Sequence, residues 1–209
     1  MSGDRHDTAR DVDVVEKKTL FQGYFRVDAY RLRHRLHAGG MSGEMRREVF
    51  ERGHAVAVLP YDPALRAIVM LEQFRVGAYA AGRPPWLTEI VAGIIGAGET
   101  PEQVARRELA EEAGLTAQNL KLMLTCLTTP GGSSETVEMF AARVDASQAG
   151  GIHGLDHEHE DIRVFVLPVI DAFRNLREGR YDNAQALIAL QWLALNENDL
   201  RAAWGFDPV

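Results

Sequence analysis

The chain has 209 residues, of which 46% are hydrophobic and 25% charged, and this suits one large or two small globular domains. The formal net charge of −7 excludes a protein that binds nucleic acid nonspecifically, because that class presents a basic surface. The N-terminus has no apolar segment, and no run approaches the roughly eighteen apolar residues of a membrane span, so we expect neither secretion nor membrane insertion.

The sequence contains a single cysteine, Cys126, and therefore forms no intramolecular disulfide. One cysteine fits the reducing conditions of the cytoplasm. Cys126 lies in the apolar run Lys121–Thr129. We therefore expect a buried strand residue there rather than a nucleophile.

The N-terminal part is predicted to be a small antiparallel β domain, residues 1–53. Residues 1–10 are polar and expected to fray. Three strand-like segments follow, at Asp11–Leu20, Tyr24–Leu36 and Glu44–Arg52. Three strands with alternating charge make a poor core by themselves. This domain is therefore expected to need a partner surface, either the main domain or a second subunit.

The composition becomes more apolar at His54, where a second domain, residues 54–209, is predicted to begin. Its first elements are expected to be a strand at His54–Asp62 that ends in a proline turn, a strand at Ala67–Arg75, a loop at Gly77–Trp86 and a strand at Leu87–Ala92.

The stretch Gly93–Leu115 is predicted to be a glycine-rich loop followed by a helix with well-defined ends. Thr100 suits the N-cap, and Gln103 three residues later completes a capping box. Gly114 suits the left-handed residue that ends a helix. The helix is therefore predicted to cover Pro101–Ala113.

The charges on this helix are unusual, because two glutamates fall among its apolar side chains. The apolar stripe consists of Val104, Ala105, Leu109 and Ala113. Glu108 and Glu112 lie within the stripe, and Glu111 lies at its edge. Carboxylates that face the core without a partner are costly, so a positive group is expected beside them, and clustered oxygen ligands favour Mg²⁺ or Mn²⁺ over zinc. The alternative is an ordinary amphipathic helix with a solvated glutamate face.

The remaining elements complete an α+β pattern. Strands are expected at Asn119–Thr129, Ser134–Val144 and Ile162–Pro168, a loop at Ser147–Asp161, and helices at Val169–Glu178 and Ala184–Asn196. This order predicts a mixed sheet covered by helices on both faces. The late loop carries Asp156, Glu158, Glu160 and Asp161, interleaved with His157 and His159. By itself this loop reads as a solvated acidic segment, with only a weak zinc signal.

The spacing of Gly93, Glu99, Arg107-Glu108-Leu109, Glu111-Glu112 and Gly114-Leu115 resembles the signature of the Nudix hydrolases at every position. The resemblance implies a Nudix fold and hydrolysis of a nucleoside diphosphate linked to another group, with divalent metal. The segments MRREVFERGHAVAVLP, EQFRVGAY, EIVAG, PGGSSE and EHEDIRV, with Pro130 fifteen residues after Leu115, are similar to the bacterial ADP-ribose pyrophosphatase subgroup.

The resemblance also implies roles for the acidic residues. Glu108 and Glu112 would bind metal, with Glu111, Glu160 and the Ala92 carbonyl as further ligands. More than one Mg²⁺, or Mn²⁺, is expected in each site. Glu158 would be the general base. Arg107 and Glu99 are expected to brace the loop against the helix rather than to touch the substrate.

A second implied group binds the substrate and consists of Tyr24, Phe25, Arg47, Glu48, Arg52, Arg75, Ile94, Thr129, Pro130, Gly131 and Glu135. In the family, arginines at the positions of Arg47 and Arg75 face the nucleotide and its phosphates, although surface ion pairing is an alternative. Tyr24 and Phe25 match aromatic residues that reach across from a partner subunit, with strand core as the alternative. Glu135 suits the ribose hydroxyls.

These features predict a cytoplasmic, Mg²⁺-dependent homodimer with sites shared between subunits, which hydrolyses ADP-ribose to AMP and ribose 5-phosphate. No nucleic-acid or membrane partner is expected. One alternative is another nucleotide sugar, such as GDP-mannose. Another is a binding module that recognises ADP-ribose without cleaving it, but such modules usually lose a signature glutamate, and all are present here.

Overall fold

The computed structural model describes residues 8–209 and divides the chain into two compact units, which we describe separately. The first comprises Met1–His54 and Leu127–Thr136, and the second comprises Ala55–Cys126 and Val137–Val209. Residues 1–7, part of the segment predicted to fray, lie outside the described residues. Within the described part of the chain, no helix has the length and apolarity needed to cross a bilayer.

The first unit is built on a three-stranded antiparallel sheet, as predicted. A short helix, α1 (Thr8–Asp11), precedes β1 (Val12–Gln22), β2 (Arg26–His34) and β3 (Met45–Glu51). The order is β1-β2-β3, and Tyr30 of β2 pairs with Lys17 on one side and Arg47 on the other. The later segment Leu127–Thr136 belongs to this unit, and Phe50 N–H donates to the Gly132 carbonyl at 2.8 Å.

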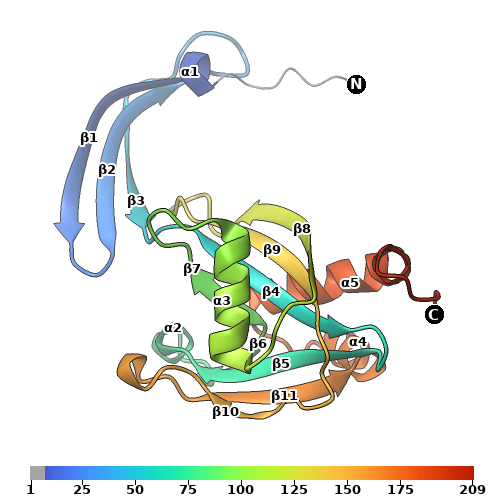
Figure 1. Cartoon of the computed structure of the whole chain (residues 1–209). Helices are drawn as coiled ribbons and strands as arrows, with labels where there is room; N and C mark the ends of the chain where they lie inside the picture. The colour runs from blue at the N-terminus through green and yellow to red at the C-terminus, as the bar shows by residue number, and fades with distance from the viewer. Residues whose placement is uncertain (1–7) are drawn as a thin grey trace. The chain divides into compact units, whose positions relative to one another are not determined.

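The second unit contains a mixed sheet, also as predicted (Figure 1). Its strands are β4 (Ala55–Asp62), β5 (Ala67–Phe74), β6 (Trp86–Glu89), β7 (Val91–Ile94), β8 (Asn119–Leu127), β9 (Thr136–Arg143), β10 (Gly151–His153) and β11 (Ile162–Pro168). The order is β10-β11-β5-β4-β9-β8, with β6 paired to β5 and β7 to β4. The sheet is mixed because β4 is parallel to β9 but antiparallel to β5 and β7.

Helices cover both faces of this sheet, because alternate residues of its strands are apolar on each side. Val56 and Val58 of β4 pack with α3 (Pro101–Ala113). Leu59 and Tyr61 pack on the other side with α4 (Val169–Arg177) and α5 (Ala184–Ala203). Figure 1 shows α3 across one face of the sheet and α5 on the other. Cys126 lies in β8 as predicted. It is only partly buried, and it packs on the side of the sheet that α4 and α5 cover.

Several elements differ from the sequence prediction. The predicted loop at 77–86 includes most of a short helix, α2 (Val76–Ala80), and the predicted strand Leu87–Ala92 is two strands, β6 and β7. The predicted loop at 147–161 contains β10 and a 3₁₀ turn, η1 (Asp156–Glu158). Pro60 does not end β4 but lies inside it, where Leu59 and Pro60 have no partner in β5 or β7. A residue without an N–H is tolerated at such a gap in the ladder.

Helix α5 continues to Ala203, seven residues beyond the predicted end at Asn196. The polar segment that follows Asn196 looks like a helix end in the sequence. In the structure its Glu197 is buried and accepts hydrogen bonds from the Tyr61 hydroxyl at 3.0 Å and from Arg66 at 2.9 and 3.0 Å. These distant partners stabilise a buried acid and let the helix continue.

Candidate active site

The candidate site is centred on α3, whose ends are fixed by local interactions. Thr100 Oγ1 accepts from the Gln103 N–H at 3.3 Å, and Gln103 Oε1 accepts from the Thr100 N–H at 2.9 Å, so the predicted capping box is present. Gly114 ends the helix in the left-handed region with φ 64°. This frame turns Glu108 and Glu112 towards the sheet, together with the predicted apolar stripe.

Glu112 is a buried carboxylate, only 4% exposed. Its Oε2 accepts from the Ala92 N–H at 3.0 Å. Burial raises the pKa of Glu112 to about 8, since the Ala92 hydrogen bond and the Arg75 charge only partly oppose the desolvation. Glu108 and Glu160 raise this pKa further through their negative charge. The ionised form of Glu112 is therefore unfavourable despite Arg75, and a further cation would stabilise it.

Glu108 lies directly against the start of the signature loop. A Cβ placed on Gly93 would overlap the Glu108 carboxylate, which explains why this position is glycine. Burial raises the pKa of Glu108 to about 6, and the positive charge of Arg107 opposes that shift. The backbone of β7 and two α3 carboxylates thus meet at one place.

Arg107 joins the loop to the helix, as predicted. Its Nη1 donates to Glu108 Oε1 at 2.8 Å and to Glu111 Oε2 at 2.9 Å, and its Nε donates to Glu99 Oε1 at 3.2 Å. The other Glu99 oxygen accepts from the Gly96 N–H at 2.8 Å. Arg107 therefore neutralises part of the acidic cluster and braces the loop at the same time.

Arg75, at the end of β5, adds a second positive charge to this face. Its Nε and Nη2 donate to Glu89 Oε2 at 2.9 and 2.7 Å. The charge of Arg75 acts on Glu112, and Glu160 acts on both. The structure therefore brings Glu108, Glu112, Glu160 and Arg75 into one electrostatic neighbourhood.

The predicted base, Glu158, lies in η1 with its side chain 57% exposed. Glu158 Oε1 lies 3.8 Å from His157 Nε2. The structure does not bring the Glu158 carboxylate against the carboxylates of α3. Glu160 Oε2 accepts from the Leu155 N–H at 3.1 Å. Within residues 8–209, no three His, Cys, Asp or Glu side chains are gathered into a ready metal-binding group.

The other predicted substrate residues belong mostly to the first unit. Glu135 is buried and accepts from Arg52 Nε at 3.1 Å and from Thr128 Oγ1 at 2.8 Å. The Thr129 carbonyl accepts from Gly132 and Ser133 N–H groups, and this turn contains Pro130 and Gly131. The Arg52 guanidinium lies 5.8 Å from the centre of the Phe25 ring. Arg52, Glu135 and Phe25 therefore form one cluster within this unit.

Tyr24 is 87% exposed in the turn between β1 and β2, so it is not strand core. It contacts Phe25, with ring centroids 4.7 Å apart. Arg47 donates to the carbonyl of Arg46, and Glu48 pairs with the Arg46 guanidinium at 2.9 Å. In the second unit, Ile94 closes β7, where it pairs with Ala55.

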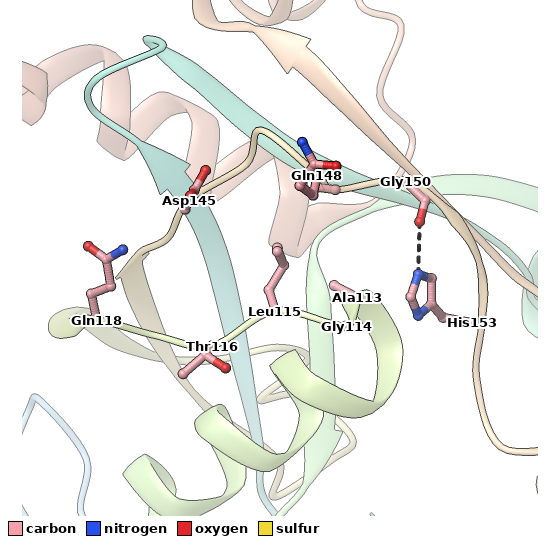
Figure 2. Close-up of a pocket in the computed structure, with 10 residues that line it drawn as sticks. Ala113, Gly114, Leu115, Thr116, Gln118, Asp145, Gln148, Gly150 and His153 are labelled. Carbon is pink, nitrogen blue, oxygen red and sulfur yellow. Dashed lines mark hydrogen bonds between the residues drawn. The ribbon is translucent and has the colours of Figure 1, made fainter.

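A cavity of about 320 Å³ lies at the C-terminal end of α3 (Figure 2). It is lined by Ala113, Gly114, Leu115, Thr116, Gln118, Asp145, Gln148, Ala149, Gly150 and His153. The His153 ring donates from Nε2 to the Gly150 carbonyl at 2.9 Å and lies against Gly114. None of the predicted site residues lines this cavity, so the carboxylate cluster and not the cavity defines the candidate site.

Sequence reasoning missed two residues of this region, Glu89 and Asn183. Glu89 is buried at the end of β6 and binds Arg75 through one oxygen. Its other oxygen, Oε1, accepts from Asn183 Nδ2 at 2.8 Å. The available signal was an acid within the apolar run Leu87–Ala92, but the partner Asn183 lies 94 positions away.

The chain is similar to a known domain family and to several named bacterial enzymes. A sequence model of the NUDIX domain matches residues 51–201. An ADP-ribose pyrophosphatase of Escherichia coli (strain K12) is 50% identical over 194 residues, covering 93% of each chain. One from Haemophilus influenzae is 42% identical over 98% of this chain and 95% of its own.

The chain is also similar, at lower sequence identity, to proteins with other names. A GDP-mannose pyrophosphatase of Pectobacterium atrosepticum is 31% identical, covering 86% of this chain and 92% of its own. The fold is also similar to a crystal structure of an ADP compounds hydrolase, with a TM-score of 0.68 and 18% identity over 93% of this chain and 96% of the other.

Proposed function

This chain belongs to the NUDIX domain family, and from that premise we propose that it hydrolyses the pyrophosphate bond of ADP-ribose, giving AMP and ribose 5-phosphate. The observation that carries the proposal is that every signature carboxylate is present, with Glu108 and Glu112 turned from α3 towards β7 and the charge of Arg75 acting on Glu112. The full-length similarity to two ADP-ribose pyrophosphatases supports the choice of substrate.

The acidic residues fit a divalent metal by their chemistry. Carboxylate oxygens from Glu108, Glu112 and Glu160, with the Ala92 carbonyl, are the hard donors that Mg²⁺ prefers, and Mn²⁺ can share them. Burial raises the pKa of Glu112, and a cation bound beside this carboxylate would favour its ionised form. These residues, with Glu111 as a further donor, would hold one or more ions. Bound metal would polarise the phosphoryl oxygens and lower the pKa of a bound water.

The remaining roles fall to the protein's own side chains. Arg75 and Arg47 bind the phosphate oxygens and orient the diphosphate for attack. Arg107 keeps Glu108 and Glu111 in place. Glu158 takes the proton of the attacking water. Its exposed position in η1 suits a loop that closes over bound substrate.

The first test is Glu158→Gln. We expect kcat to fall by about two to four orders of magnitude, with little change in KM, because a positioned base contributes about that much. Glu102→Gln, an exposed carboxylate in the first turn of α3, is the control and should retain activity. If Glu158→Gln stays within about threefold of the wild type, the base must be sought at Glu111 or Glu112.

GDP-mannose is the alternative substrate, because GDP-mannose pyrophosphatases are similar over most of this chain. A panel of nucleoside diphosphate sugars, compared by kcat/KM, separates the two. A higher kcat/KM for GDP-mannose than for ADP-ribose would reverse the assignment. Calorimetric binding of ADP-ribose with Mg²⁺ but without product would instead indicate a non-catalytic binding module.

We further propose a cytoplasmic homodimer whose sites are shared between subunits. The lone Cys126 fits a reducing compartment. The apolar side chains Val14 and Phe21 on β1, and Tyr24 after it, are exposed in the single chain, which supports a partner surface on the first unit. The predicted division into domains 1–53 and 54–209 is part of this proposal.

A further inference from the structure

A buried acid links the end of β5 to the beginning of α5. Glu89 Oε2 accepts two hydrogen bonds from the Arg75 guanidinium, at 2.9 and 2.7 Å. Glu89 Oε1 accepts from Asn183 Nδ2 at 2.8 Å. Each carboxylate oxygen therefore has its own donor, and the side chain is fixed from both ends.

The orientation of Asn183 is determined by its second role as the N-cap of α5. Its Oδ1 accepts from the Ala186 N–H at 3.0 Å, so its amide nitrogen must point to Glu89. Turning the amide over would break the cap and set two acceptors against each other. The start of α5 therefore holds Glu89 in one rotamer.

Arg75 is in turn held by its backbone and its side chain. Its N–H donates to the Pro85 carbonyl at 2.7 Å, and its guanidinium rests on Glu89. The side chain nevertheless remains 40% exposed, and its charge acts on Glu112 and Glu160. Glu89 fixes one edge of the Arg75 guanidinium, and the side chain is partly exposed beside the acidic site. In this position the guanidinium is oriented to bind an anion.

We propose that Glu89 and Asn183 are positioning residues, which hold the Arg75 guanidinium in the orientation with which it binds the diphosphate of the substrate. This inference rests on the proposed function. A flexible Arg loses conformational entropy when it binds a phosphate, and a side chain already fixed by its neighbours loses less. Glu89 and Asn183 therefore contribute to substrate affinity through Arg75, without touching the substrate.

Two substitutions test this without changing the charge of the site. Glu89→Asp keeps the carboxylate but shortens it by one carbon, so it cannot reach both Arg75 and Asn183. Asn183→Ser keeps an N-cap for α5 but removes the amide donor. The affinity of the protein for the α,β-methylene analogue of ADP-ribose, which is not hydrolysed, is measured by calorimetry with Mg²⁺ present, with the melting temperature as a check on folding.

We expect Glu89→Asp to weaken binding about tenfold and Asn183→Ser about threefold, since the cost of immobilising one long side chain on binding lies in this range. Kinetics with Mg²⁺ should show the loss mainly in KM. Asp182→Asn is the control: it breaks the exposed pair with Arg83, at 2.8 Å, one residue before Asn183, and should bind like the wild type.

The decisive comparison is the double mutant with Arg75→Ala. If Glu89 acts through Arg75, then Glu89→Asp has no further effect on affinity once Arg75 is gone. Equal weakening in both backgrounds, or wild-type affinity in both single variants, overturns the inference. A wild-type protein that neither binds the analogue nor hydrolyses ADP-ribose overturns the proposed function instead.

Discussion

At the scale of single residues, the buried Glu112 couples folding to pH. Burial raises its pKa to about 8 in the folded chain, from an ordinary value near 4.5 in the unfolded chain. The protonated form is favoured by folding, so this contribution is fully present below about pH 4.5 and is lost as pH rises to about 8.

We therefore predict that the metal-free protein loses about 3–5 kcal/mol of unfolding free energy from Glu112 between pH 4.5 and pH 8, in proportion to the pKa shift. Urea denaturation of wild type and Glu112→Gln in EDTA measures the difference. The variant should have the flatter pH profile, and parallel profiles would contradict the prediction. Mg²⁺ should raise the melting temperature of the wild type at pH 8, because it binds the ionised site.

The backbone at Gly93 lies so close to the Glu108 side chain that there is no space for a Cβ atom. We predict that Gly93→Ala abolishes activity and weakens metal binding, because its Cβ would displace the Glu108 carboxylate. Gly77→Ala in α2 is the matched control, since a Cβ there meets nothing within 4 Å. Activity assays and Mn²⁺ titration of both variants check this, and an active Gly93→Ala protein would show that Glu108 can move freely.

At the scale of elements, α5 is anchored to the sheet by the buried Glu197, which pairs with the half-exposed Arg66. Glu197 joins Arg66 and Tyr61, and Arg201 one turn later donates to the Tyr61 hydroxyl at 3.2 Å and to the Pro63 carbonyl at 2.6 Å. The network also holds Arg66 in its left-handed conformation, with φ 51°. The second half of α5 therefore depends on the turn between β4 and β5.

We predict that Glu197→Ala destabilises the protein by about 1–3 kcal/mol, because it leaves the buried Tyr61 hydroxyl without its acceptor and removes the partner of the half-exposed Arg66. Glu72→Ala is the control: it removes an exposed pair with Arg163 at 3.0 Å and should cost at most about 1 kcal/mol. Chemical denaturation measures both. Similar losses in the two variants would mean that burial of Glu197 does not decide the stability of α5.

At the scale of the whole molecule, the proposal of shared sites predicts complementation between two inactive proteins. Tyr24→Ala and Glu112→Gln subunits are each expected to be inactive alone. If Tyr24 of one subunit serves the carboxylates of the other, each mixed dimer contains one intact site. Random mixing should then restore about a quarter of wild-type activity. If both residues serve a site within one subunit, every site keeps a defect and mixing restores nothing.

The sequence by itself determined the elements whose signals are local. The ends of α3 follow from Thr100, Gln103 and Gly114, all within a turn of the residues they cap. The placement of Glu108 and Glu112 follows from the helical repeat, and the bracing by Arg107 and Glu99 was predicted with it. The mixed sheet and its helical layers were likewise predictable, because strand and helix periodicity are local properties. The family followed from the resemblance of the stretch Gly93–Leu115 to a known signature.

Only the tertiary structure decided which buried polar side chains find a hydrogen-bond partner in a distant segment of the chain. The extension of α5 depends on Glu197 meeting Arg66, 131 positions away, and the fixed orientation of Arg75 depends on Asn183 through Glu89. Periodicity contains no information about such pairs, because a buried acid is tolerable only when the folded chain brings a donor to it.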